Sequence, residues 1–155
     1  MEFAIACLAD RRCRPFENKK GFIMDIEMEL SRIVIQENTD QQIIVLKEKQ
    51  GPRSFAIVIG MAEAYAIHQR LKGFIPPRPL THDLVHNVIE DMGGQLERIV
   101  INDLRDHTFY ARLVIRDRQG GLIEVDSRPS DAIALVAGNA SVPVFVAEHV
   151  LDEVS

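Results

Sequence analysis

The sequence is poor in cysteine, in aromatic residues and in positive charge. Its 155 residues include two cysteines, Cys7 and Cys13, two tyrosines and no tryptophan. Two thiols near one end cannot form a disulfide framework or a four-cysteine zinc site, so we expect a reducing, cytoplasmic setting. Tyr65, Tyr110 and the seven phenylalanines form no stripe on which a single-stranded nucleic acid would stack.

The charge balance and the apolar runs exclude further classes of protein. There are 18 Lys and Arg against 23 Asp and Glu, a net charge of -5, which excludes a strong non-specific duplex binder. No apolar run approaches the ~18 residues of a transmembrane helix, so we expect no membrane partner. The apolar stretch 3–9 follows Glu2 and precedes three arginines, the reverse of a secretory signal. P-loop, dinucleotide and nucleophile-elbow motifs are missing too.

The composition is that of a globular protein, with 46% hydrophobic and 26% charged residues in a length that suits one domain. Residues 1–24 stand apart, because they carry a net charge of +2 and the remainder carries -7. They also lack sustained periodicity. We therefore predict a poorly ordered N-terminal extension over residues 1–24 and a folded domain over residues 25–155. A functional basic arm, or a start of translation at Met24 or Met28, is the alternative.

Strands and helices mix without regular alternation beyond residue 25. Runs of β-branched and alternating apolar residues predict strands over 26–35, 42–47, 55–59, 96–104, 108–115, 122–125 and 144–146. Helical spacing predicts helices over 61–71, 84–92 and 131–137. This order predicts an α+β fold, in which a mostly antiparallel mixed sheet packs with about three helices in a single compact domain. Segments 131–137 and 144–146 are apolar on nearly all sides, so we also expect a homo-oligomer.

Two short motifs repeat one pattern. Each has an Arg-Pro pair, then a hydroxyl residue and an aspartate, and each leads into a predicted helix. The motifs are RPLTHDL (78–84) and DSRPSDA (126–132). The repetition marks both helix starts as candidates for a functional site.

The motifs have a structural and a functional interpretation. In the structural one, proline starts the helix, Thr81 and Ser130 cap it, and Asp83 and Asp131 lie at the positive end of its dipole. In the functional one, helix starts and arginine forks bind phosphate, the aspartates hold a divalent metal and His82 moves protons. The residues alone leave both interpretations open.

With four further stretches, the two motifs make the sequence resemble the bifunctional nuclease domain family. The additional stretches are IVLKE (44–48), IVIGMAEA (57–64), DLRDHTFYARL (103–113) and PVFVAE (143–148). The resemblance covers about residues 25–150 and leaves out the N-terminal segment. It implies a compact α+β domain that forms homo-oligomers and acts on both DNA and RNA.

The resemblance implies a nuclease, and we assign roles on positions that match the family motifs. We predict hydrolysis of phosphodiester bonds in DNA and/or RNA, with nucleic acid as a transient substrate and a divalent metal, Mg²⁺ or Mn²⁺, as cofactor. The predicted catalytic residues are His82, Asp83 and Asp131. The predicted phosphate-binding residues are Arg78, Arg128 and Ser130. The predicted metal ligands are Glu63, Asp83 and Asp131, although Glu63 also suits a partner of the helix dipole.

Two alternatives stay open at this point. One is a non-enzymatic oligomeric module that binds a small anionic ligand or a protein partner through the same helix starts. Such a module would saturate, whereas a nuclease would turn over many equivalents of substrate. The other is a zinc protease, because His82 and His86 have the spacing of its helix motif. That motif needs a glutamate where this chain has Asp83, and no third ligand follows.

Overall fold

The computed structural model describes residues 24–155, so the predicted N-terminal extension lies outside the described residues except for Met24. Seven strands and four helices follow in the order β1 (Asp25–Val34), β2 (Gln41–Glu48), β3 (Ser54–Gly60), α1 (Met61–Leu71), α2 (Thr81–Asp91), β4 (Gln95–Arg105), β5 (Thr108–Arg116), β6 (Leu122–Ser127), α3 (Pro129–Val136), β7 (Val144–Ala147) and α4 (Glu148–Val154). The predicted α+β fold is confirmed. It has one helix more than expected, because the seven residues of α4 are too few for helical periodicity to show.

All seven strands form one mixed sheet in the order β3-β2-β1-β7-β4-β5-β6. Strands β1 to β3 make one antiparallel meander, and β4 to β6 make another. Strand β7 lies between the two meanders, antiparallel to β1 and parallel to β4, so that Val144 pairs with both Met28 and Ile99. The single parallel pair agrees with the mostly antiparallel mixed sheet that the sequence predicts.

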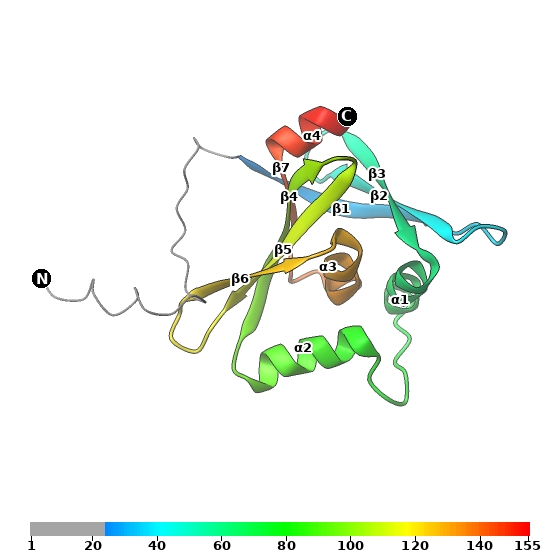
Figure 1. Cartoon of the computed structure of the whole chain (residues 1–155). Coiled ribbons are helices and arrows are strands. Elements are labelled where there is room, and N and C mark those ends of the chain that lie inside the picture. Colours follow the sequence, from blue (N-terminus) through cyan, green and yellow to red (C-terminus); the bar gives the residue numbers. More distant parts are fainter. Residues whose placement is uncertain (1–23) are drawn as a thin grey trace, which may run out of the picture.

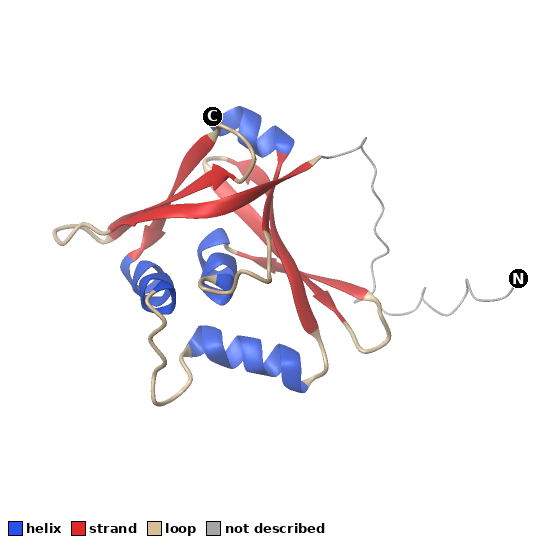
Figure 2. Ribbon diagram, turned by 180° about the vertical axis from the view of Figure 1, so that it is seen from behind, coloured by secondary structure: helices blue, strands red, loops and turns tan. Residues whose placement is uncertain are grey.

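Irregular pairing bends the two longest strands. The register of β1 shifts after Leu30, and that of β4 shifts after Leu96 and again after Ile101. Such bulges increase the local twist and turn the strand. The sheet therefore curves around α1 and α3, with α2 across one end of the molecule and α4 at the other, as Figures 1 and 2 show.

The hydrophobic core lies between the curved sheet and α3. Seven of the eight residues of α3 are buried, and Asp131 is the exception. The strands add fully buried side chains such as Ile44, Ile99 and Val146. The apolar surface of α3 is thus covered inside the domain, and the reason from which we expected a homo-oligomer was wrong. None of the helices between residues 24 and 155 is long and apolar enough to cross a membrane.

Several elements leave apolar side chains in contact with solvent, and α2 and β6 have no buried residue at all. Leu84 and Val88 on α2 are 56% and 46% exposed, and Ile123 and Val125 on β6 are 44% and 41% exposed. Strand β6 is also an edge strand, which pairs with β5 alone. Exposed apolar surface therefore lies on α2 and β6, where the sequence did not predict it.

The loop after α3 approaches α1 closely at a glycine. Gly138 has a φ of +78°, and a Cβ added there would lie 2.9 Å from the carbonyl oxygen of Arg70. Gly120 has a similar φ of +85°, but an added Cβ would meet no atom within 4 Å. Comparing a substitution at the two glycines therefore separates the cost of the left-handed backbone, which both share, from the cost of a close contact, which only Gly138 has.

We expect Gly138→Ala to lower the free energy of unfolding by about 2 kcal/mol or more, and Gly120→Ala by about 1 kcal/mol. Both variants force a left-handed backbone on a residue with a Cβ, but only the first also pushes α3 and α1 apart. Urea denaturation of the two variants and the wild type measures the difference. Equal losses would contradict a close contact between Gly138 and α1.

Candidate active site

The first turns of α1, α2 and α3 meet at one place. Glu63 is the third residue of α1, His82 is the second residue of α2, and Asp131 is the third residue of α3. Arg128 comes immediately before α3, whose first residue is a proline, as the sequence predicts. We call Glu63, His82, Arg128 and Asp131 the helix-start cluster.

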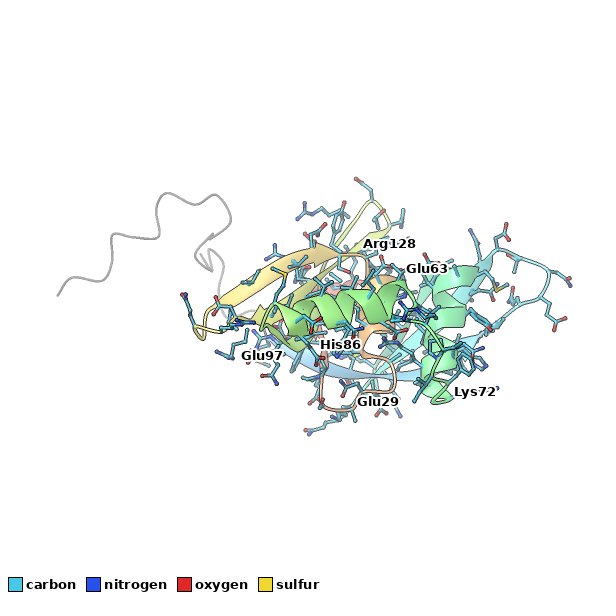
Figure 3. All side chains as sticks on the ribbon, turned by 90° about the horizontal axis from the view of Figure 1, so that it is seen from below. Glu29, Glu63, Lys72, His86, Glu97 and Arg128 are labelled. Atoms are coloured by element: carbon cyan, nitrogen blue, oxygen red, sulfur yellow. The ribbon has the colours of Figure 1, made fainter. Side chains whose placement is uncertain are left out.

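Arg128 is the centre of the helix-start cluster. Its Nε donates to Asp131 Oδ2 at 2.7 Å, and its Nη2 donates to Asp131 Oδ1 at 2.9 Å. The same Nη2 lies 3.0 Å from Glu63 Oε1, so the guanidinium group bridges α3 and α1. Figure 3 shows Arg128 and Glu63 next to each other. One cation thus lies between two carboxylates.

His82 joins the helix-start cluster from α2. Its Nε2 lies 3.5 Å from Asp131 Oδ1, at the outer limit of a hydrogen bond. The Arg128 side chain is 66% exposed, whereas those of His82 and Glu63 are 19% and 18% exposed. The cluster therefore has an open, cationic side and a sheltered side on which an imidazole faces a carboxylate.

Asp131 is ionised at neutral pH. Burial raises the pKa of its carboxyl group, but the hydrogen bonds and the positive charge of Arg128 outweigh that effect, and His82 acts in the same direction as Arg128. The pKa of Asp131 consequently lies below its usual value. An ionised Asp131 is a suitable partner for the N–H group of the His82 ring.

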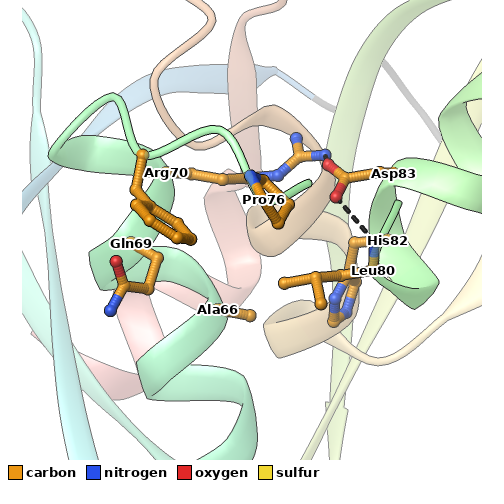
Figure 4. Close-up of a pocket in the computed structure, with 8 residues that line it drawn as sticks. Ala66, Gln69, Arg70, Pro76, Leu80, His82 and Asp83 are labelled. Carbon is orange, nitrogen blue, oxygen red and sulfur yellow. Dashed lines mark hydrogen bonds and ion pairs between the residues drawn. The ribbon is translucent and has the colours of Figure 1, made fainter. Parts of the chain in front are cut away.

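Asp83 takes part in a different set of contacts. Its Oδ1 accepts a hydrogen bond from Arg70 Nη2, and its Oδ2 accepts one from the Leu80 N–H at 2.9 Å. Arg70 also donates through Nη1 to the Leu135 carbonyl oxygen at 2.8 Å. Figure 4 shows Arg70 reaching from α1 to the Asp83 carboxylate, while the His82 ring points away from it. We call Arg70, Leu80, Asp83 and Leu135 the Arg70 junction.

The structure brings together four of the seven predicted site residues, namely those of the helix-start cluster. Glu63, Asp83 and Asp131 were predicted to hold a metal jointly. Among the residues from 24 to 155, no group of three or more His, Cys, Asp and Glu side chains is placed to hold a metal ion. Asp83 pairs with Arg70, whereas Glu63 and Asp131 share Arg128.

The side chains of the two remaining predicted residues take no part in the hydrogen bonds of the helix-start cluster within residues 24–155. Ser130 is 7% exposed and buried in the first turn of α3. Arg78 is exposed in the loop between α1 and α2, and within the described part of the chain it forms no ion pair.

The capping prediction was wrong at both helix starts. The N-cap residues are Leu80 and Arg128, and at neither start does the side chain of the N-cap residue accept a hydrogen bond from the first turn. Both helices begin earlier than predicted, so Thr81 and Ser130 already lie inside the first turn. At α2 the Asp83 carboxylate accepts a hydrogen bond from the N–H of the N-cap residue Leu80, as the third residue of a helix does in a capping box.

Arg70 is the site residue that the sequence reasoning missed. It lies seven positions, or about two helical turns, after Glu63. Both residues therefore share the face of α1 that carries the buried Ile67. Two charged residues on a buried helix face were the signal that could have identified it.

The pKa of Asp83 predicts how the Arg70 junction responds to acid. Burial raises this pKa, but hydrogen bonds from the Leu80 N–H and Arg70, with the Arg70 charge, lower it further than burial raises it. An aspartate with a lowered pKa stabilises the fold fully above the unfolded pKa of about 3.9 and loses that effect as the pH falls through the folded pKa. Asp83→Asn should therefore destabilise the protein at pH 7 and much less at pH 3. Urea denaturation at pH 7 and at pH 3 measures the loss in the free energy of unfolding. An equal loss at the two pH values would contradict the prediction.

Comparisons with known proteins agree with the motifs. The sequence model of the bifunctional nuclease domain matches residues 44–155, a range that includes the helix-start cluster and the Arg70 junction. Two relatives come from Mycobacterium tuberculosis, Uncharacterized protein MT1877 of strain CDC 1551 and Uncharacterized protein Rv1829 of strain H37Rv. Each is 41% identical over 125 residues, which make up 81% of this chain and 73% of the relative. The extent of both matches shows that the chain belongs to the bifunctional nuclease domain family.

Proposed function

We propose that the protein is a nuclease that hydrolyses phosphodiester bonds in DNA and/or RNA, and that the helix-start cluster is its active site. The observation that carries this proposal is the arrangement of Arg128, Asp131 and His82. An exposed arginine, an ionised carboxylate and an imidazole meet where three helices begin. Membership in a family described as bifunctional nucleases supports the same conclusion.

Arg128 is suited to bind the phosphate group of the substrate. Its planar fork matches two phosphate oxygens, and two thirds of its side chain is exposed. The dipoles of the three helix starts also favour an anion. A phosphate would compete with Glu63 and Asp131 for the guanidinium group, so we expect weak substrate binding, in agreement with a net charge of -5.

His82 is suited to transfer the proton. Hydrolysis needs a group that takes a proton from water or gives one to the leaving oxygen, and histidine does this near neutral pH. Asp131 holds the ring through Nε2, so Nδ1 is the atom that would exchange the proton. In this assignment Asp131 orients the ring of His82.

A divalent metal remains part of the proposal, with a smaller set of ligands than the sequence predicted. Magnesium in phosphoryl-transfer sites usually takes one or two carboxylates, several waters and oxygens of the substrate. Glu63 and Asp131 fit this pattern, because they already share one cation, whereas Asp83 does not join them. A bound metal would neutralise charge on the phosphate and lower the pKa of a bound water.

The second candidate function is a binding module for an anionic ligand or a protein partner. The observation that favours it is that carboxylates already neutralise Arg128 in the helix-start cluster. Such a module binds one equivalent of ligand and changes no bond. Turnover therefore separates the two functions.

We expect the purified protein to cleave many equivalents of single-stranded or double-stranded DNA or RNA with Mg²⁺ or Mn²⁺, and to lose activity when the metal is chelated. His82→Gln should lower turnover by about 100-fold or more, because it removes the proton-transfer group. His149→Gln is the matched control, since His149 lies on α4 at the other end of the molecule. Conversion of one equivalent or less, or full activity of His82→Gln, would contradict the proposal.

We also propose that the protein forms a homo-oligomer, through α2 and β6 rather than α3. Both elements lack buried residues and carry exposed apolar side chains, which water contacts unfavourably. Light scattering at micromolar concentration should show more than one copy per particle. Val88→Glu should shift the particle toward the monomer, and a monomeric wild type would contradict the proposal.

A further inference from the structure

Helix α2, which carries His82, has little apolar packing to hold it in place. None of its 11 residues is buried, whereas α1 buries Ala64 and Ile67, and α3 is buried along almost its whole length. Apolar burial is what usually fixes the position of a helix on a domain. Ile89, in the last turns of α2, packs against the core and is partly buried, but it lies about two turns after His82. The position of the first turn of α2 therefore depends strongly on its polar contacts.

Those polar contacts converge on Arg70. The guanidinium group donates through Nη1 to the Leu135 carbonyl oxygen of α3 and through Nη2 to the Asp83 carboxylate of α2. Since Arg70 itself belongs to α1, one side chain joins three helices. Its exposure of 23% leaves it partly shielded from water, which strengthens both interactions.

The backbone around Arg70 is held in place as well. Ile67, one turn earlier on the same face of α1, is completely buried. Gly138 approaches the Arg70 carbonyl oxygen so closely that a Cβ has no room there. Arg70 consequently extends toward α2 from a packed region of the domain.

Both oxygens of Asp83 are used within the Arg70 junction. Oδ1 pairs with Arg70, and Oδ2 accepts the Leu80 N–H, which fixes the residue at the start of the helix. Asp83 and His82 are neighbours in the chain, so an Asp83 held at both oxygens also fixes the direction of the His82 side chain. His82 then faces Asp131 on the neighbouring helix α3.

From these contacts we propose that Arg70 is a positioning residue, which acts through Asp83 to hold His82 against Asp131. The consequence for catalysis rests on the proposed function, but the consequence for the placement of His82 does not. Asp83 accordingly acts in positioning, and not as the catalytic or metal-binding carboxylate that the sequence predicts. Arg70 touches neither the substrate nor the reacting atoms in this assignment.

Lysine cannot replace arginine in this role. The two bonds of Arg70 leave from different nitrogens and run to different helices. A lysine keeps the charge but offers one nitrogen at the end of a flexible stem. Arg70→Lys is therefore a conservative variant that should fold and still lose the geometry.

The test compares Arg70→Lys and Asp83→Asn with Arg53→Lys in the full chain. Arg53 is a matched control, because it also joins two elements, through Glu48 and Asp152, and has a similar exposure of 30%. Four quantities are measured: kcat and KM on a nucleic-acid substrate, the side-chain NMR signals of His82, and the hydrogen-exchange rate of the Leu84 amide, which donates to the Leu80 carbonyl oxygen. Thermal unfolding checks that each variant is folded.

We expect Arg70→Lys and Asp83→Asn to lower kcat by roughly 10- to 100-fold with little change in KM, because a displaced catalytic group affects the chemical step more than binding. Both should shift the His82 signals and speed exchange of the Leu84 amide. The double variant should lose little beyond the single variants, since the two residues act as one unit. Arg53→Lys should change none of these quantities.

The two proposals fail in different ways. A wild type that does not cleave nucleic acid overturns the nuclease, while the His82 signals and amide exchange still test Arg70. Unchanged His82 signals in folded Arg70→Lys and Asp83→Asn would overturn the positioning role, even if the protein is a nuclease. Equal effects of Arg53→Lys on His82 would overturn it too, because they would show a general loss of stability.

Discussion

Burial of α3 against the curved sheet determines where the other parts of the candidate site can lie. Seven of its eight residues face the interior, so the helix cannot rotate or slide without exposing apolar surface. Its first turn reaches the edge of the core, and there Asp131 is the single side chain that stays partly accessible. Helix α1 packs along α3 with the same direction, so that Glu63 meets Arg128 at one end and Arg70 meets Leu135 at the other.

The side chains of the helix-start cluster offset the positive charge that helix starts alone would concentrate at this place. Three helix starts present positive dipole ends to the same place, and two carboxylates and one guanidinium group fill it. This arrangement keeps the site close to neutral. In the function that we propose, a phosphate of the substrate would take Arg128 from the protein's own carboxylates, and release of the product would restore those pairs. Such a balance would suit brief contact with nucleic acid better than tight binding.

The sequence predicted most of the fold and about half of the site, and the division has a physical cause. The strands and the helices α1 and α3 can be recognised in the sequence as periodic apolar patterns, because the spacing of apolar residues determines which face is buried. The Arg-Pro motifs likewise marked two helix starts, since proline and aspartate act within one turn. Pairing between distant side chains leaves no such pattern. Nothing in the motif RPLTHDL shows that Asp83 would turn toward Arg70, and the hydroxyl of Ser130 looks the same in sequence whether buried or open.

The central place of β7 has a consequence for synthesis of the protein. The two meanders can each form from neighbouring segments as the chain leaves the ribosome, but their inner strands β1 and β4 have no partner on one side until β7 is made. An unpaired strand edge invites wrong pairing with other chains. Only when residues 144–147 emerge can β7 join the two half-sheets. A premature stop codon before residue 144 would therefore release two unjoined half-sheets, which chaperones and proteases would meet in place of a folded domain.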